Sequence, residues 1–131
     1  MNHIFTTQRV VTSEEIDQLN HVNNVVYLQW VQDIAEQHWA ELSKNNPQPD
    51  YIWVVIRHEI DYLQQAVLGD TITLKTWVGE TQGVKSVRHV EIYKDAVLLV
   101  KAQTTWCLLH AKTLRPTRIT ESVINTLLPQ K

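Results

Sequence analysis

The spacing of hydrophobic residues changes along the chain from alternation to a helical period of about 3.6 residues and back again. Residues 4–12 are rich in β-branched side chains and are predicted to form a first strand. Residues 25–42 carry apolar side chains at helical spacing, which predicts an amphipathic helix lying on a flat apolar surface, most simply a sheet. The apolar stripe contains Leu28, Val31, Ala35, Trp39 and Leu42, widened by Tyr27, Trp30 and Ile34.

Alternation returns after residue 50 and predicts four more strands, whose short connections indicate antiparallel pairing. The first of these is expected to place Ile52, Val54, Ile56, His58 and Ile60 on one face. A short terminal helix capped by Thr120 is predicted near residues 123–128. The pattern therefore indicates an α+β domain, with one long helix on an antiparallel five-stranded sheet. The four strands are expected over residues 52–60, 71–78, 84–93 and 97–110, with a loop from Gly79 to Gly83.

The composition limits the class of protein. The 131 residues are expected to form a single domain, 1–131, and a net charge of -2 without a basic block argues against a nucleic-acid partner. Cys107 is the only cysteine, which excludes an intramolecular disulfide and a cysteine-based zinc site. The first five residues lack the pattern of a signal peptide, and no apolar run approaches membrane-spanning length. We therefore expect a cytoplasmic protein with no membrane partner.

The densest group of chemically capable side chains lies in residues 17–27, at the predicted start of the helix. It brings a carboxylate, Asp17, an imidazole, His21, and several carboxamides into one turn. A helix cap needs only one such side chain, so the stretch is either an over-supplied cap or an active site. In an active site, the carboxylate would act as base or nucleophile, and free N–H groups at the helix start would hold a developing oxyanion.

The same stretch carries a family resemblance. The run His21-Val22-Asn23-Asn24, with Asp17 before it and Tyr27-Leu28 after it, resembles the signature of the hotdog-fold acyl thioesterases. The match is to the 4-hydroxybenzoyl-CoA thioesterase-like group and to the plant acyl-carrier-protein (acyl-ACP) thioesterases. The resemblance implies a hotdog fold, in which the sheet wraps around the long helix. Supporting marks are residues 59–63 leading to Gly69-Asp70, and Arg115-Pro116 with Ile119 after the last strand.

The resemblance implies hydrolysis of acyl-CoA or acyl-ACP thioesters, with catalytic roles for Asp17, His21 and Asn24. Asp17 would attack the carbonyl or orient water, and the backbone N–H of Asn24 would contact the oxyanion. His21 would donate to the substrate carbonyl or to Asp17, or it would support the turn. Asn23 is expected to cap the helix or to contact substrate. Tyr27 is a further substrate-binding candidate beside the acyl chain, and it suits the core equally well.

A thioesterase that acts on coenzyme A needs cations near the nucleotide phosphates. The candidates are Lys85, Ser86 and Arg88, together with Arg115 and Arg118, although each also suits an ordinary surface position. The histidines and carboxylates show no ligand spacing, so no metal and no cofactor are expected. The resemblance also implies a homodimer or homotetramer.

Two other functions stay open. A non-catalytic acyl-CoA-binding module would use the same pocket. It is favoured by Leu19, which occupies the position where the plant enzymes have an Asn thought to take part in catalysis; in this chain Asn20 comes one residue later. A dehydratase would keep the hotdog fold but space its carboxylate and histidine differently.

Overall fold

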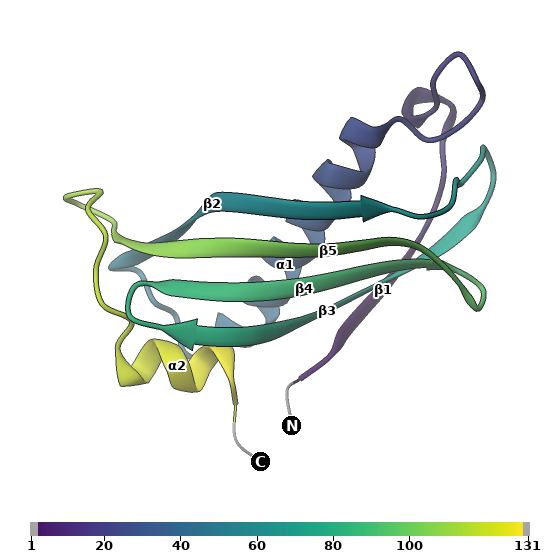
Figure 1. Ribbon diagram of the computed structural model, residues 1–131. Helices are drawn as coiled ribbons and strands as arrows, with labels where there is room; N and C mark the ends of the chain where they lie inside the picture. The colour runs from purple at the N-terminus through teal and green to yellow at the C-terminus, as the bar shows by residue number, and fades with distance from the viewer. Residues whose placement is uncertain (1–2, 130–131) are drawn as a thin grey trace.

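One long helix lies across one face of a five-stranded sheet in the computed structural model, which describes residues 3–129 (Figure 1). The first two and last two residues of the predicted domain, 1–131, lie outside the described residues. The elements are β1 (Phe5–Val10), the one-turn 3-10 helix η1 (Ser13–Glu15), α1 (Asn24–Ser43), β2 (Tyr51–Tyr62), β3 (Thr71–Gln82), β4 (Lys85–Lys94), β5 (Val97–His110) and α2 (Glu121–Leu127).

The sheet has the strand order β1-β3-β4-β5-β2, and every neighbouring pair is antiparallel. Strands β3, β4 and β5 follow one another through tight turns, whereas residues 63–70 carry the chain from the β2 edge to β3 beside β1. Register shifts interrupt the pairing of β2 with β5, of β3 with β4 and of β4 with β5. Bulges of this kind bend and twist the strands in which they occur.

The predicted helix is confirmed, with α1 extending one residue beyond the prediction at each end. Asn23 caps it, because its side-chain oxygen accepts a 3.1 Å hydrogen bond from the N–H of Val25. The buried face is centred slightly differently from the predicted stripe, since Leu28, Trp39 and Leu42 are only half-buried. The short terminal helix is also confirmed, and the Thr120 hydroxyl accepts from the N–H of Val123. The buried residues of α1 are Tyr27, Trp30, Val31, Ile34, Ala35 and His38.

The prediction for one face of β2 was wrong. The pairing of β2 with β5 shifts between Val55 and Arg57, so the side chains before and after this bulge alternate in opposite senses. As a result Ile52 and Ile56 are exposed, although Ile60 after the bulge packs against the core. A strict period of two cannot reveal an extra residue, because the bulge leaves no mark in the local pattern.

The predicted loop from Gly79 to Gly83 was also wrong, because β3 continues to Gln82 and only a tight turn separates it from β4. Gly79 lies within the strand, where a Cβ atom would approach Nε2 of His89 to 2.6 Å. This glycine therefore allows close contact with the His89 ring, which is one of the reasons glycine occurs inside strands. Gly83 has a φ of 66° and forms the turn itself.

The core between α1 and the sheet has two hydrophobic clusters. The larger one contains Tyr27, Trp30 and Ile34 from α1, and the smaller one lies beside α2 and contains Val123 and Leu127. Polar residues occupy the strand positions between the two clusters. Thr76 separates Leu74 of the larger cluster from Val78 of the smaller one, and Arg88 and Thr104 lie on neighbouring strands.

Candidate active site

The predicted catalytic stretch forms a closed turn at the start of α1. Ile16 pairs with Val22 across the turn, and the N–H of Asp17 donates to the carbonyl of His21 at 2.8 Å. Asn20 adopts a φ of 64°, a left-handed conformation that asparagine tolerates better than most residues. The turn residues therefore occupy defined positions, which an active site on a loop requires.

The carboxylate of Asp17 bonds to the backbone of its own turn. Its Oδ1 accepts from the N–H of Leu19 at 2.9 Å and from the N–H of His21 at 3.2 Å. Its Oδ2 has no hydrogen-bond partner among residues 3–129, and the side chain is exposed. Asp17 thus has the geometry of a turn-forming residue, and it also presents one unoccupied carboxylate oxygen to the surroundings.

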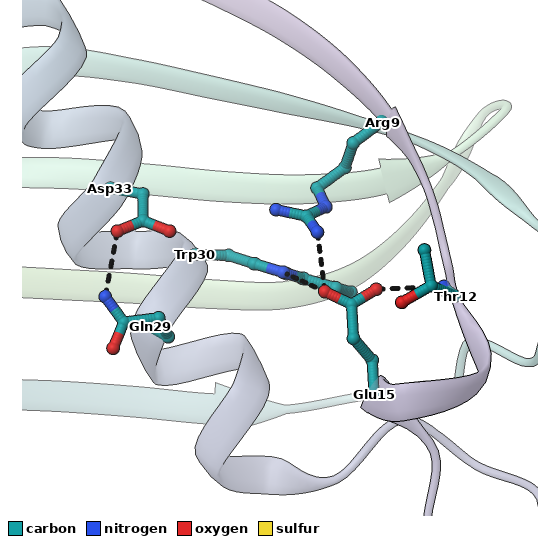
Figure 2. A network of polar contacts seen from close by, with 6 residues as sticks. All are labelled: Arg9, Thr12, Glu15, Gln29, Trp30 and Asp33. Atoms are coloured by element: carbon teal, nitrogen blue, oxygen red, sulfur yellow. Dashed lines mark hydrogen bonds and ion pairs between the residues drawn. The ribbon is translucent and has the colours of Figure 1, made fainter.

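A second carboxylate, Glu15, fastens the turn to both layers of the domain (Figure 2). Its Oε2 lies 2.5 Å from Nη2 of Arg9 on β1 and accepts a 3.1 Å hydrogen bond from the indole N–H of Trp30 on α1. Its Oε1 accepts from the N–H of Thr12. Burial raises the pKa of Glu15, but the hydrogen bonds from Thr12 and Trp30 and the charge of Arg9 outweigh it, so the pKa lies below its ordinary value. Glu15 is therefore held as an anion in a supporting position.

The connection between β2 and β3 closes the other side of the turn. His21 pairs with Val67, and the N–H of Val22 donates to the carbonyl of Ala66 at 3.0 Å. The connection is itself fixed by Asp70, whose Oδ2 accepts from the N–H of Val67 and whose Oδ1 contacts Nζ of Lys94. The backbone of His21 is therefore anchored on two sides, whereas its ring has no hydrogen-bond partner among the described residues.

The first turn of α1 contains the backbone N–H groups among which an oxyanion donor is predicted from the sequence. The N–H of Val25 is taken by the Asn23 side chain, and the N–H of Val26 by the Asn23 carbonyl. The N–H of Asn24 has no partner among residues 3–129, as is usual for the first residues of a helix. Positive potential at a helix N-terminus favours a negative group at this point.

Tyr27, predicted as a substrate contact, belongs to the core. Its side chain is 1% exposed, and its hydroxyl accepts a 3.0 Å hydrogen bond from the N–H of Ala66. Its ring makes an edge contact with Trp30 and a tilted contact with Tyr62. Burial raises the pKa of the Tyr27 hydroxyl above its ordinary value. The side chain is therefore shielded from a ligand at the turn, and it ties α1 to the connection that anchors His21.

The three residues predicted to hold the coenzyme A phosphates do not form one cluster. Ser86 and Arg88 are buried on the helix side of β4, whereas Lys85 is exposed and lies beside a shallow pocket on the other face. Successive residues of a strand point to opposite faces, so Lys85 cannot share a face with its neighbour Ser86. The predicted grouping of these three side chains was wrong, while Arg115 and Arg118 are exposed as expected.

A buried polar group in the middle of the domain was missed by the sequence analysis. His38 is 0% exposed, and its Nδ1 accepts a 2.7 Å hydrogen bond from Nη1 of Arg88. Its Nε2 lies 2.9 Å from Nδ1 of His3, so Nε2 carries the proton of the neutral ring and donates to His3. The signal was available in the sequence, because His38 follows Ile34 by four residues and Ala35 by three on the buried face of α1.

Most of the chain matches a family of known proteins. The sequence profile described as the acyl-ACP thioesterase N-terminal domain matches residues 2–127. The chain belongs to this family. The resemblance seen at residues 17–27 is therefore confirmed, and so is the hotdog arrangement of one long helix and a five-stranded antiparallel sheet.

Individual relatives share limited sequence identity with the chain. A chloroplastic acyl-[acyl-carrier-protein] hydrolase from Cuphea viscosissima is 29% identical over 82 residues, which are 61% of this chain and 20% of that enzyme. The chain thus spans about a fifth of the length of the plant enzyme.

Two solved structures show the same fold. A predicted thioesterase from Bacillus stearothermophilus has a TM-score of 0.86 at 22% identity, with 95% of this chain and 94% of that chain covered. A 1,4-dihydroxy-2-naphthoyl-CoA thioesterase from Synechocystis has a TM-score of 0.82 at 18% identity, with 95% and 96% covered.

Residues 3–129 contain neither a metal-binding cluster nor a membrane-spanning helix. No group of three or more histidine, cysteine, aspartate or glutamate side chains is placed to hold a metal ion within this part of the chain. None of its helices is long and apolar enough to cross a membrane. The expected absence of a metal and of a cofactor stays a prediction from the sequence.

Proposed function

We propose that this protein is an acyl thioesterase whose active site is the turn of residues 17–24. Two groups that lie seven residues apart in the chain, and that have no hydrogen-bond partner among residues 3–129, support the proposal. These are the Oδ2 atom of Asp17 and the N–H of Asn24 at the start of α1. A thioester hydrolase needs a basic or nucleophilic group and an oxyanion donor, and this turn presents both.

The reaction consumes one water and one thioester and releases a carboxylic acid and a thiol. The carbonyl oxygen of the substrate would accept from the N–H of Asn24, which stabilises the negative charge that forms on it. Asp17 either takes a proton from the attacking water or attacks the carbonyl itself to form an anhydride that water then opens. In both routes the carbon–sulfur bond breaks, and the departing thiolate takes up a proton to become the thiol.

The neighbouring side chains have supporting roles in this proposal. His21 bonds to Asp17 through its backbone, and its ring, which has no hydrogen-bond partner among the described residues, is available to donate to the carbonyl or to the leaving sulfur. Asn23 fixes the start of α1 as its cap, and so holds the N–H of Asn24 in position. Several exposed apolar side chains surround the turn, which favours contact with an apolar acyl chain. They include Leu19, Val25, Leu63 and Leu68.

The substrate class is a thioester of coenzyme A or of acyl-carrier protein. The carrier protein is supported by the plant relative, and coenzyme A by the naphthoyl-CoA enzyme of the same fold. Lys85, Arg115 and Arg118 remain exposed cations that suit the nucleotide phosphates or an acidic carrier protein, whereas buried Arg88 and Ser86 do not. We infer a cytoplasmic setting for these substrates from the sequence alone.

A homodimer would pair one of the two edges of the sheet. Strand β2 is an edge strand with β5 as its one neighbour, and it presents Ile52 and Ile56 on its exposed side. Unpaired edges with apolar side chains favour pairing with a second chain. Light scattering is expected to give twice the protomer mass of 15.3 kDa, and Ile56→Lys is expected to lower the measured mass. A mass of 15.3 kDa at micromolar concentration would contradict the dimer.

The experiment that tests the function is a panel of thioesters assayed with a thiol reagent. It should contain short, long and aromatic acyl-CoAs and acyl-ACPs, and hydrolysis of at least one class is expected. Saturable binding without any turnover across the panel would favour the acyl-CoA-binding module and contradict hydrolysis. That alternative has one sequence feature in its favour, Leu19 at the position of the plant Asn.

A further inference from the structure

A cavity lies between the C-terminal half of α1 and the sheet. Its volume is about 260 Å³, and Trp39, Trp53 and Trp106 form much of its wall. Ala35 of α1 also lines it, eleven residues after Asn24 in the helix, which corresponds to roughly 16 Å along the helix axis. The cavity is therefore separate from the turn that carries Asp17, and the thioesterase proposal assigns it no role.

A buried cation lines this cavity. Arg88 is 5% exposed, and it forms no ion pair with any carboxylate of residues 3–129. Its Nη1 donates to Nδ1 of His38 and to the hydroxyl of Thr76. Its remaining N–H groups have no partner among the described residues. Burial lowers the pKa of the guanidinium to about 10, which still leaves it charged at neutral pH. A buried charge without a counter-ion is costly, so an anion placed here would be strongly favoured.

The cavity wall also has more donors than acceptors. The indole N–H groups of Trp53 and Trp106 are buried, and neither has a hydrogen-bond partner among residues 3–129. The hydroxyl of Ser86, which also lines the cavity, is paired with the hydroxyl of Thr81 at 2.8 Å. Buried polar groups are nearly always satisfied in native proteins, and two unpaired donors in one wall suggest that a ligand supplies the acceptors.

We propose that this cavity binds a small organic carboxylate with a flat, apolar body. The carboxylate would pair with Arg88, whose planar guanidinium suits bidentate contact with carboxylates, and the body would lie among the three tryptophans. The volume is just below the usual range for drug-sized ligands, roughly 300–1,000 Å³, so the ligand has about the size of one ring. Glu36 is the single acidic residue of the lining, and because it is exposed, water weakens but does not remove its repulsion of the carboxylate.

Benzoate is the probe that tests this proposal, with benzamide as its neutral analogue of the same shape. Saturable benzoate binding is expected to shift the side-chain indole N–H signals of Trp53 and Trp106 in proton–nitrogen NMR spectra. The indole signal of Trp77 should stay in place, because this residue stacks on His89 and does not line the cavity. Benzamide should bind at least about tenfold more weakly, since it lacks the charge that pairs with Arg88.

Two substitutions separate a charge-based site from an apolar hole. Glu36→Gln should tighten benzoate binding severalfold and leave the affinity for benzamide unchanged. Because Glu36 is exposed, this variant is expected to fold normally. Arg88→Met should abolish the preference for benzoate over benzamide. If Arg88→Met does not fold, Glu36→Gln and the comparison of benzoate with benzamide still test whether the site binds the charge.

Three results would overturn the proposal. The first is equal binding of benzoate and benzamide, which would indicate a purely apolar cavity. The second is benzoate binding that leaves both indole signals unmoved. The third is an undiminished preference for benzoate over benzamide in a folded Arg88→Met variant, which would show that Arg88 does not hold the carboxylate. None of these measurements depends on thioester hydrolysis.

Discussion

Nη1 of Arg88 lies 2.7 Å from Nδ1 of His38, and this contact joins the middle of β4 to the C-terminal half of α1. Because a guanidinium can only donate, the His38 ring must be neutral to accept. Burial, then the charge of Arg88 and the nearby His3, lower the pKa of His38 to about 3. The pair is therefore a buried hydrogen bond that depends on an uncharged histidine.

Acidification should destabilise the protein through this histidine. Below about pH 6.5 the unfolded chain binds a proton at residue 38 that the folded chain does not, so stability falls by about 1.4 kcal/mol per pH unit. The expected loss between pH 7 and pH 5 is about 2 kcal/mol. Burial lowers the pKa of His58 as well, which adds in the same direction. Urea unfolding at several pH values measures the slope.

His38→Gln keeps an acceptor for Arg88 and removes the titrating group. Its stability should therefore be lower at pH 7 but flatter between pH 7 and pH 5 than that of the original protein. His110→Gln, outside this pair, serves as the control and should leave most of the slope unchanged. An unaltered slope in His38→Gln would show that other groups cause the acid sensitivity.

Glu15→Gln should weaken both stability and catalysis. The substitution leaves Arg9 without its ionic partner and disturbs the acceptor for Trp30, with an expected cost of about 1–3 kcal/mol. Turnover should fall in the folded protein too, because Glu15 holds the turn of residues 16–22 against β1 and α1. The melting temperature and turnover of Glu15→Gln should be compared with those of Glu14→Gln, because Glu14 is the neighbouring carboxylate and is exposed. Equal melting temperatures for the two variants would contradict the anchoring role.

Tyr27→Phe distinguishes a role of Tyr27 in the core from a role in substrate binding. Removal of the hydroxyl leaves the buried N–H of Ala66 without an acceptor, at a cost of about 1–3 kcal/mol. The KM of the folded variant should be unchanged, because the side chain is shielded from a ligand. Tyr93→Phe is the control, because the Tyr93 hydroxyl donates to Glu91 on its own strand and not to a residue of the turn. A large rise in KM with unchanged stability would restore Tyr27 as a substrate contact.

The sequence predicted the elements that depend on local patterns. The helix from Asn24 to Ser43 and its Asn23 cap follow from helical spacing and capping chemistry, and the turn at Asp17 follows from its composition. It did not predict the strand through Gly79, because the same residue type marks both loops and close contacts inside strands.

The candidate site was predicted only where neighbouring residues define it. Asp17, Asn23 and Asn24 lie together because they share one turn. Arg88 was predicted wrongly for a different reason, because a cation is usually expected on the surface. Its burial against His38 depends on the pairing of β4 with β3 and on the packing of α1. The anchoring role of Glu15 was not predicted either, because Arg9 and Trp30, which contact it, lie on other elements of the chain.

The central claim concerns the carboxylate of Asp17. Asp17→Asn keeps an oxygen that can accept from the N–H groups of Leu19 and His21, so the turn and the melting temperature should be preserved. It removes the negative charge that attacks or activates water. Asp61→Asn, an exposed carboxylate on β2, is the matched control.

The measurement that tests the claim most directly is kcat of Asp17→Asn on the best substrate of the thioester panel, with the melting temperature recorded on the same sample. The account predicts a fall of roughly 100-fold or more in kcat, little change in substrate affinity, and full turnover in Asp61→Asn. Near-full turnover in Asp17→Asn, with His21→Ala inactive, would contradict the assignment of Asp17 as the catalytic group.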